Sequence, residues 1–478
     1  MSWSGSTAQQ IAKAVRRGDA DAAFVVDHHL RHIEDHRETE GALTSVRKVE
    51  ARAEAAAVDA VDPQPTSGPA GDEAGDVFAR TGSNATREAL PAAGVPVAVC
   101  EQLPVTGHAP RLGSNAAVLP IAESDHQAVQ RIRGAGAVVV GLGRSSELGL
   151  WPATEDDGNV PANPWRPDRG VGGPSGGTAL AVATGAAAIG IGLDGPGSAG
   201  GVRTAAAACG IIAYSPDHVP ADIDADPDQW LSGHVGVLAT TVDDAALAYA
   251  ALTHRIPRQT GDPGRLRIAA SNSAPLPARV DDEATKSLLK AVRALTDLGH
   301  DTFRSRPKFG TRLTSASSGA WSCAAYLRSL KCGPDGLQRR TKRLVSVGEK
   351  TYLKGLFGGV LGDGRRVRGH LEDWFDTEDF DLLITPGMPG PPPAAQEWSG
   401  QTLRSNVTHL AGSATFTAPF SLAGLPALVV PVGTRGDGAP ATVQLVGPPG
   451  STGRLFDVAA QLVAKLRPRR YAPSLTWD

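Results

Sequence analysis

Two glycine-rich segments set the architecture expected of this chain: Gly172-Gly-Pro-Ser-Gly-Gly-Thr178 and, beyond an Ala/Gly-rich helix, Gly190-Ile-Gly-Leu-Asp-Gly-Pro-Gly-Ser-Ala-Gly-Gly-Val-Arg203. Glycine at this density lets backbones approach closely and directs several N–H groups to one point, which suits an anion or an oxyanion. Tight packing turns in an Ala-rich core would give the same pattern. The two segments therefore indicate a candidate site without identifying its chemistry.

Short apolar runs and helical patterns alternate on both sides of these segments. Strands are predicted at residues 95–100, 137–141, 381–385, 427–432 and 441–446, the last two as a pair. The spacing of apolar residues predicts two or three amphipathic helices between residues 7 and 60, and a further helix at residues 125–134. This alternation is typical of an α/β sheet.

The composition favours a folded protein that acts on small molecules or proteins. The 478 residues include 56 Gly and 36 Pro, but 41% are hydrophobic and 20% are charged, so a large core can be buried. A formal net charge of −3 and the lack of a long basic run argue against binding to nucleic acid or to a membrane surface. Residues 61–93 are rich in Pro, Gly, Ser and Asp, and we expect them to form a flexible inserted loop.

The cysteines and the start of the chain give expectations about compartment and cofactors. Four scattered cysteines without CxxC spacing predict reduced thiols rather than a zinc site or a disulfide framework. The first residues lack a signal-peptide pattern, and no run of about 18 uncharged apolar residues occurs, so we expect a soluble cytoplasmic protein. No metal cluster, nucleotide fingerprint or covalent-cofactor lysine is visible, so no metal or other cofactor is expected. The oligomeric state stays open, with a homodimer as one possibility.

The chain resembles the amidase signature family over almost its whole length. Gly172-Gly-Pro-Ser-Gly-Gly stands where the family has G-G-S-S-G-G, and Leu422-Ala-Gly-Leu-Pro-Ala427 and Leu382-Leu-Ile-Thr-Pro386 match later family motifs in the same order. The resemblance implies an α/β fold in a single domain spanning residues 1–478, with a large mixed β-sheet flanked on both faces by helices. It also implies Ser-cisSer-Lys hydrolase chemistry on amide and related acyl bonds.

The position of the family's catalytic lysine holds a cysteine in this sequence. The family pattern G-I-P-V-A-V-K-D is read here as Gly94-Val-Pro-Val-Ala-Val-Cys-Glu101, which places Cys100 at the lysine position. The sequence has no lysine between Lys48 and Lys286, so no neighbour in this region can replace it. The resemblance therefore implies a site without its general base.

The second member of the family triad, a serine that follows a cis peptide bond, is replaced by Pro174. A cis bond before a non-proline residue costs about 3–4 kcal/mol, whereas before proline the penalty is about 0.5–1 kcal/mol. Proline can thus keep the backbone shape while deleting the hydroxyl that relays the proton. We predict that the Gly173–Pro174 bond is cis.

The nucleophile position depends on the direction of counting. Counting forward from Asp194, where the family reads D-x-G-G-S, places Ser198 at the nucleophile, whereas counting back from Arg203 places Gly201 there. The loop carries three extra residues relative to the family pattern. We favour Ser198, because its separation of 24 residues from Pro174 is the one that the family motif shows.

The loop before Ser198 also lacks a hydrogen-bond donor. In the family, backbone N–H groups of D-x-G-G-S form the oxyanion hole, and Pro196 has no N–H to offer. The loss of one such donor typically costs about 10²–10³ in rate. Gly173, Gly195 and Gly197 are retained, and we expect their backbones to line a substrate pocket.

Several polar residues could compensate or take new roles. A Cys100–His108 pair could provide a thiolate nucleophile, although a buried inert thiol is the commoner outcome. Ser175, next to the relay position, offers a replacement hydroxyl but still lacks a base. His108 and Arg111 stand where the family has apolar or threonine residues, as a new polar pocket wall or as solvated loop residues. Glu147 keeps an acid of the family, which we expect to be structural.

Three functional hypotheses follow from these residues. The first is an amidase-fold enzyme that carries out a non-hydrolytic reaction, such as cyclisation, condensation or rearrangement of an amide- or acyl-bearing metabolite, in secondary metabolism. The second is a non-catalytic binding or scaffold protein. The third is an amide hydrolase that uses Ser198 with an unrecognised base. In each of them the expected partner is a small-molecule amide or acyl compound, bound for turnover or for recognition.

Overall fold

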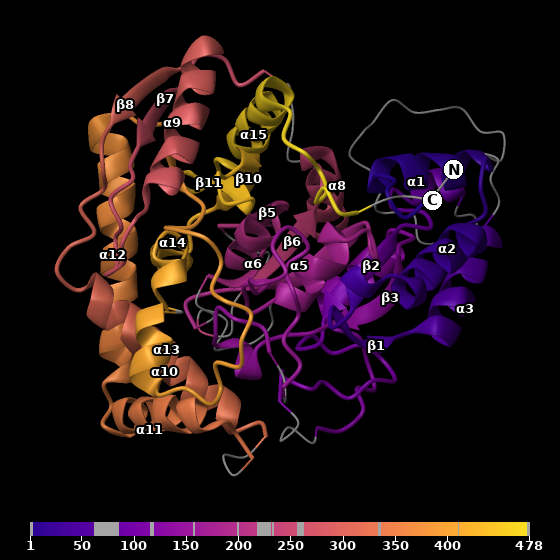
Figure 1. Ribbon diagram of the computed structural model, residues 1–478, viewed down its shortest axis with the longest axis horizontal. Coiled ribbons are helices and arrows are strands. Elements are labelled where there is room, and N and C mark those ends of the chain that lie inside the picture. Colours follow the sequence, from indigo (N-terminus) through magenta and orange to yellow (C-terminus); the bar gives the residue numbers. More distant parts are fainter. Residues whose placement is uncertain are drawn as a thin grey trace.

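The computed structural model describes residues 3–61, 86–114, 119–155, 158–197, 200–217, 231, 234–255, 262–332, 336–409 and 411–475 (Figure 1). The strands are β1 (Leu43–Val46), β2 (Pro96–Cys100), β3 (Val138–Gly143), β4 (Ile189–Asp194), β5 (Ile212–Ser215), β6 (His234–Ala239), β7 (Arg267–Ala270), β8 (Asp301–Arg304), β9 (Leu382–Pro386), β10 (Ala427–Thr434) and β11 (Pro440–Val446).

Helices precede, separate and follow these strands in the sequence. The α-helices are α1 (Ala8–Arg17), α2 (Ala22–Asp35), α3 (Lys48–Asp59), α4 (Gln127–Gly134), α5 (Gly176–Ala183), α6 (Gly201–Cys209), α8 (Val242–Thr253), α9 (Asp282–Asp297), α10 (Leu313–Ser329), α11 (Arg339–Leu353), α12 (Phe357–Glu378), α13 (Leu403–His409), α14 (Ala418–Ala423) and α15 (Thr452–Leu466). Four 3-10 helices are η1 (Arg37–Thr39), η2 (Arg87–Ala89), η3 (Glu147–Gly149) and η4 (Ala411–Ala414).

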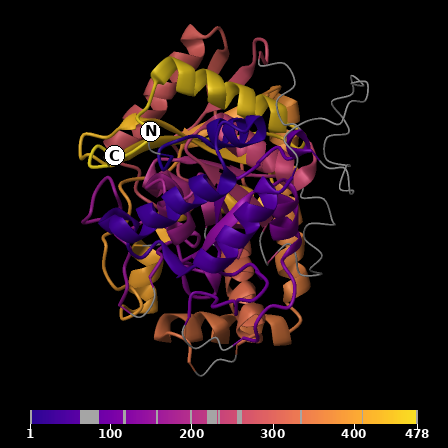
Figure 2. The same ribbon diagram turned by 90° about the vertical axis from the view of Figure 1, so that its right-hand side faces the viewer.

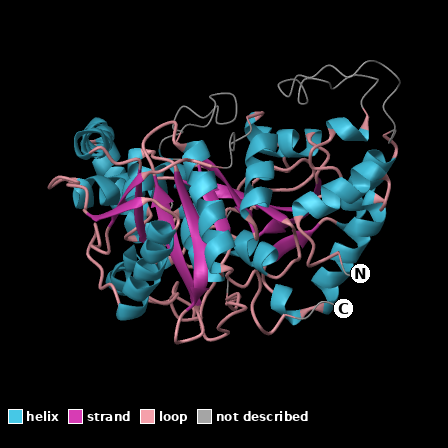
Figure 3. Ribbon diagram, turned by 90° about the horizontal axis from the view of Figure 1, so that it is seen from above, coloured by secondary structure: helices cyan, strands magenta, loops and turns pink. Residues whose placement is uncertain are grey.

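Within the described residues, eleven strands form one mixed sheet. Its order is β1-β3-β2-β4-β6-β5-β10-β11-β9-β7-β8. Strand β2 runs parallel to both β3 and β4, and β7 runs parallel to both β8 and β9, while the central strands pair antiparallel. Helices cover both faces of the sheet, as the view from above shows (Figure 3). The expected single α/β architecture, a mixed sheet flanked by helices, is thus present.

Two apolar clusters hold this sheet between its helices. The larger one joins the strands to α1, α2, α4, α5, α6, α8, α9 and α15. The smaller one joins α10, α11, α12 and α14 to the opposite side of the β7–β9 region, where these helices form a layer of their own (Figure 1). Every residue of α5 and of α6 is buried, which explains why the sequence of these two helices is so rich in Ala and Gly.

One glycine shows how tightly α5 packs on the sheet. A Cβ placed on Gly143, the last residue of β3, would lie 2.1 Å from the Thr178 hydroxyl and 2.8 Å from its backbone. Only glycine allows the helix to approach the strand this closely. Gly177, within the first glycine-rich segment, is restricted in the same way, because a Cβ there would lie 2.3 Å from the Ala42 backbone oxygen, so packing explains part of that segment.

The two ends of the chain meet beside the N-terminal helices (Figure 2). Arg470 donates a hydrogen bond to the backbone oxygen of Gly5 at 3.3 Å. Thr7 caps α1 through a capping box with Gln10, in which each side chain bonds the backbone N–H of the other residue. The C-terminal segment is thereby fixed against the start of the chain.

The predicted elements agree closely with the observed ones, with some differences. The five predicted strands correspond to β2, β3, β9, β10 and β11, and the last two pair as expected. Strands β4, β5, β6, β7 and β8 were not predicted, and β4 covers the start of the second glycine-rich segment. Strand β1 was not predicted, because its four residues are half-buried and lie within a helical region. Of the predicted loop at residues 61–93, residues 62–85 lie outside the described residues, whereas η2 and the buried turn at Ala92 and Ala93 are ordered structure. None of the helices in the described ranges is both long and apolar enough to cross a membrane.

Candidate functional site

Cys100 lies at the end of β2, at the position expected for a catalytic base. Its side chain is 1% exposed, and burial raises the pKa of the thiol to about 12. The Ser175 hydroxyl hydrogen-bonds the sulfur. A thiol in this environment stays protonated at neutral pH, so it acts neither as a base nor as a thiolate nucleophile.

The Gly173–Pro174 peptide bond is cis, as predicted. The Pro174 carbonyl accepts a hydrogen bond from the Ser146 backbone N–H at 3.1 Å and one from the Thr154 hydroxyl at 3.3 Å. The same hydroxyl accepts from the Gly176 backbone N–H at 3.0 Å. The turn before α5 is therefore fixed on both sides of the position where a relay hydroxyl would stand.

Ser175 precedes α5 and is completely buried. Its Oγ accepts a hydrogen bond from the Leu193 backbone N–H at 3.3 Å, and the hydroxyl also hydrogen-bonds the Cys100 thiol. Neither partner, the Leu193 N–H or the protonated Cys100 thiol, can act as a base that takes the Ser175 hydroxyl proton. The replacement hydroxyl that the sequence offers is thus present beside Cys100, but it is not activated.

The glycine loop begins at Asp194, which forms a buried ion pair with Arg203 of α6. The guanidinium donates to Asp194 Oδ2 at 2.8 Å and to Oδ1 at 3.1 Å, and the two side chains are 1% and 0% exposed. Arg203 also donates to Gln444 Oε1 at 2.7 Å, to the Thr417 carbonyl at 3.2 Å and to the Ser421 hydroxyl. This network joins β4, α6, β11 and α14 around the start of the loop.

Arg328, on α10, anchors the loop from the other side. Its guanidinium donates to the carbonyls of Leu148 at 2.8 Å, Gly197 at 3.2 Å and Leu231 at 2.9 Å. A Cβ on Gly197 would lie 2.2 Å from the Ala324 side chain, so the loop packs directly on α10. The Gly197 carbonyl is thus bound by Arg328, and the Gly197 backbone packs against α10.

Ser198 lies outside the described residues, so its predicted role stays a prediction. Gly201, the alternative position for the nucleophile, is the first residue of α6, and a Cβ there would lie 2.5 Å from the Asp194 Cα. The position therefore has neither a reactive side chain nor space for one. Gly200, before it, adopts φ +90° between the hydroxyls of Thr204 and Thr417.

The structure does not bring His108 to Cys100. Arg47 Nε donates to His108 Nε2 at 3.1 Å, and Glu50 lies 3.6 Å from the same nitrogen. Burial and the Arg47 charge lower the pKa of His108, so the ring is neutral and serves as an acceptor. Arg111, also expected in the pocket wall, is half-buried and acts electrostatically on Glu101. Within the described residues, the structure shows no hydrogen bond between His108 and Cys100.

Two carboxylates near the site are engaged by backbone and hydroxyl groups. Glu101 accepts from the Ser145 backbone N–H at 2.9 Å and from its hydroxyl at 3.1 Å. Glu147 accepts from the Gln338 N–H at 3.0 Å and from the Ser114 hydroxyl at 3.0 Å, which ties the start of α11 to η3. Burial raises the pKa of both carboxyls. Glu147 thus has the structural role that the sequence suggested.

Sequence reasoning missed two arginines that organise this region. Arg328 was not singled out, and Arg340, which is fully buried, pairs with Glu155 at 2.5 Å and donates to Asn406 Oδ1 at 2.8 Å. The Arg340 guanidinium also lies over the Trp151 ring, 4.6 Å from its centroid. The available signal for Arg328 was that it is the one charged residue in the sequence of α10.

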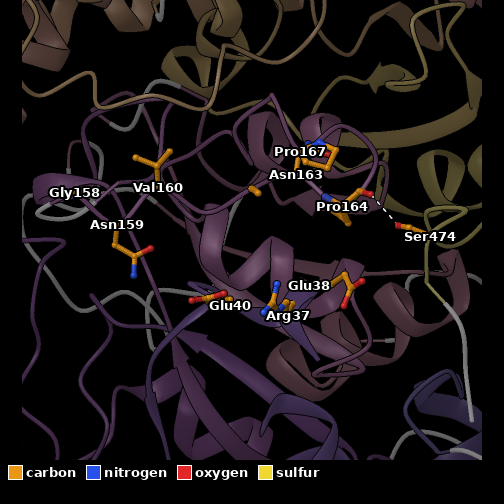
Figure 4. Close-up of a pocket in the computed structure, with 11 residues that line it drawn as sticks. Arg37, Glu38, Glu40, Gly158, Asn159, Val160, Asn163, Pro164, Pro167 and Ser474 are labelled. Atoms are coloured by element: carbon orange, nitrogen blue, oxygen red, sulfur yellow. Dashed lines mark hydrogen bonds between the residues drawn. The ribbon is translucent and has the colours of Figure 1, made fainter. Parts of the chain in front are cut away.

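A large cavity is lined by none of these residues. It measures about 730 Å³ and opens between η1, residues 158–167 and the C-terminal segment (Figure 4). Arg37, Glu38 and Glu40 line one side, and Pro164 lies opposite, with its carbonyl accepting from the Ser474 hydroxyl at 3.3 Å. None of the predicted site residues lines this cavity. In the described part of the chain, no group of three His, Cys, Asp or Glu side chains is placed to hold a metal ion.

Comparisons with known proteins place this chain among amidases. Residues 70–456 match the family described as Amidase. The putative amidase AmiB2 of Mycobacterium bovis is 32% identical over 393 residues, which cover 78% of this chain and 82% of the relative. The 6-aminohexanoate-cyclic-dimer hydrolase of a Pseudomonas species is 29% identical over 396 residues, which cover 73% of this chain and 79% of the relative.

Solved structures agree on the fold. A structure of 6-aminohexanoate cyclic dimer hydrolase complexed with substrate matches with a TM-score of 0.81 at 24% identity, covering 99% of each chain. A bacterial aryl acylamidase of the amidase signature family matches with a TM-score of 0.76 at 20% identity, covering 96% of each chain. At these identities the likeness concerns the fold alone.

Proposed function

This chain belongs to the amidase family, and on that premise we propose that it converts an amide- or acyl-bearing small molecule by a non-hydrolytic reaction. Cyclisation, condensation and rearrangement are the reaction classes that fit. The site consists of Cys100, Pro174, Ser175 and the loop that starts at Asp194. The conversion proceeds without the lysine and serine relay of the family.

One observation carries the proposal. The base position holds a buried thiol whose pKa is raised to about 12, and the neighbouring Ser175 hydroxyl is engaged by this thiol and by the Leu193 N–H. No group in this arrangement can take a proton from a water molecule or from a serine nucleophile. An acyl group bound here would be protected from water-derived nucleophiles, which favours a reaction between parts of the substrate itself.

Amide hydrolysis through Ser198 is the competing function, and the similarity to relatives named as amidases favours it. It needs a base that is so far unrecognised. The carboxylates of Glu101 and Glu147 accept hydrogen bonds from backbone N–H groups, and the His108 ring accepts one from Arg47. None of the three is placed as a base beside Cys100.

Mass spectrometry in ¹⁸O-labelled water can test the proposal. The purified chain is incubated with an extract rich in amides and acyl conjugates, and the Ser198→Ala and Ser175→Ala variants are run in parallel. The proposal expects products without ¹⁸O: isomers of the substrate for a rearrangement, products lighter by the leaving group for a cyclisation, or the sum of two reactants minus the leaving group for a condensation. Products that gain ¹⁸O, together with labelling of Ser198 by a fluorophosphonate probe, would establish hydrolysis instead. Saturable binding without any conversion would favour the non-catalytic scaffold.

Restoring the family's residues at Cys100, Pro174 and Pro196 tests whether the missing base, relay hydroxyl and oxyanion donor prevent amide hydrolysis. The Cys100→Lys/Pro174→Ser variant should show no amide turnover on a chromogenic anilide while Pro196 remains, because one oxyanion donor is still lacking. Adding Pro196→Gly should raise turnover by about 10²–10³ over the double variant. Equal turnover of the double and triple variants would refute the role given to Pro196.

A further inference from the structure

A second cavity, of about 280 Å³, lies at the carboxyl ends of three parallel strands. Ser271 and Ser273 follow β7, Arg306 and Lys308 follow β8, and Thr385 belongs to β9. The residues that line it do not include Cys100, Pro174 or Ser175. Its chemistry is therefore considered from its own lining, although Phe420 is next in the chain to Ser421, which donates to Asp194 at 2.7 Å.

The chain topology makes this position suitable for a ligand. From β7 the chain passes through α9 to β8 on one side, whereas from β9 it passes through α13 and α14 toward β10 on the other side. The backbones thus separate just beyond the ends of β7 and β9, and in open α/β sheets ligands bind in the crevice formed at such a point.

The alternation of side chains fixes which face of the sheet carries the cavity. Ile268 and Leu382 pack in the apolar cluster of α9, whereas Ala269 and Leu383 pack in the cluster of α10, α12 and α14. Because side chains two residues apart share a face, Ser271 and Thr385 point to the second face, beyond Ala269 and Leu383. Both hydroxyl residues are buried, and they form the inner wall of the cavity.

The lining combines positive charge with apolar surface. Arg306 and Lys308 are both exposed at its rim, and none of the described residues that line the cavity is acidic. Arg306 donates to the Ser273 hydroxyl at 3.2 Å, which directs its guanidinium toward the end of β7. The Phe309 and Phe420 rings, with centroids 5.9 Å apart, supply the apolar wall.

We infer that this cavity binds a small anion, a carboxylate or a phosphate, attached to an apolar group of about the size of a phenyl ring. The anion lies between Arg306 and Lys308, and the apolar group packs against Phe309 and Phe420. The volume is just below the range of about 300–1,000 Å³ that suits drug-sized ligands, so the ligand is small. A carboxylate and a phosphate would both be recognised by charge-assisted hydrogen bonds from Arg306 and Lys308.

Isothermal titration calorimetry on the full chain tests this inference, with benzoate, phenyl phosphate and the neutral isostere benzamide as probes. At least one of the two anions should bind, with weaker affinity as the salt concentration rises, and benzamide should bind at least about tenfold more weakly. Arg306→Gln and Lys308→Gln should each weaken binding of the anion by about three- to tenfold. Because both side chains are exposed, these variants should fold normally.

Two matched variants make the result specific. Arg293→Gln removes the same charge from the exposed face of α9, and Arg111→Gln removes it near the first site. Both should keep the affinity of the unmodified chain. Equal binding of benzamide, loss of affinity in Arg111→Gln but not in Arg306→Gln, or absence of binding by both anions would overturn the inference. Preference for one anion would identify the source of the negative charge.

Discussion

Replacing Arg203 by methionine should destabilise the protein strongly, because it leaves Asp194 charged and unpaired in the core. The Asp194 side chain is 1% exposed, and two of the hydrogen bonds to its carboxylate come from Arg203. Breaking a buried pair by removing one partner costs about 3–5 kcal/mol. An unfolding entropy of about 2.1 cal/mol/K per residue gives about 1 kcal/mol/K for a chain of this length. The midpoint of thermal unfolding should therefore fall by about 3–5 °C.

Differential scanning calorimetry measures this shift, and two further variants define its origin. Arg265→Met removes an ion pair of similar geometry, 2.6 Å to Asp301, but at the surface, and should leave the midpoint within about 1 °C. The double variant Asp194→Leu/Arg203→Met should regain part of the loss, since no charge then stays buried. If Arg203→Met and Arg265→Met lower the midpoint equally, burial is not the cause and the reasoning fails.

Three other predictions concern single positions. In the native protein at about pH 8, iodoacetamide should modify Cys100 far more slowly than the half-exposed Cys332, as followed by peptide mass spectrometry, because a thiol with a pKa of about 12 is only about 10⁻⁴ ionised. Burial raises the pKa of Glu101, so its contribution to the free energy of unfolding is lost as the pH rises through the raised pKa. The urea midpoint of the unmodified protein should therefore fall between about pH 4.5 and neutrality, and this fall should be smaller in Glu101→Gln. Gly200→Ala should cost about 1–3 kcal/mol more than Gly18→Ala in urea unfolding, because both positions have positive φ but only at Gly200 would the Cβ lie 2.1 Å from a threonine hydroxyl.

Each of these has a result that would contradict it. Modification of Cys100 at the rate of Cys332 would mean that the site is open to solvent. An unchanged pH dependence in Glu101→Gln would show that the carboxyl titrates normally in the folded protein. Equal losses for the two glycine variants would mean that backbone conformation alone, and not the close threonine hydroxyls, decides the cost.

The architecture could be predicted well from sequence because it depends on local patterns. Strands β2 and β9 are apolar runs flanked by turn residues, and the cis bond before Pro174 follows from the chemistry of proline itself. Six of the eleven strands in the described residues, β1 and β4 to β8, were not predicted, and β1 shows most clearly why. Its residues carry no strong pattern, and they become a strand only because β3 offers hydrogen-bond partners about 95 residues further along the chain.

The contacts of the candidate site could not be predicted as well from the sequence, because they join residues that are far apart along the chain. His108 could be weighed against Cys100, its near neighbour in sequence, but the ring pairs with Arg47, 61 residues away. The partners of Arg203 on β11 and α14 lie more than 210 residues beyond it. Side-chain identity could suggest that these groups are charged or polar, but only the folded backbone decides which of them meet.

The way in which Arg328 holds the glycine loop has a consequence for how this region can change over evolutionary time. Its contacts with Leu148, Gly197 and Leu231 are all to main-chain oxygens. These hydrogen bonds do not depend on the side chains at the three positions, although packing against α10 leaves no room for a Cβ at Gly197. A substitution at one of these positions therefore leaves the Arg328 hydrogen bond available wherever the new side chain fits, whereas loss of this one helical arginine would remove all three contacts at once.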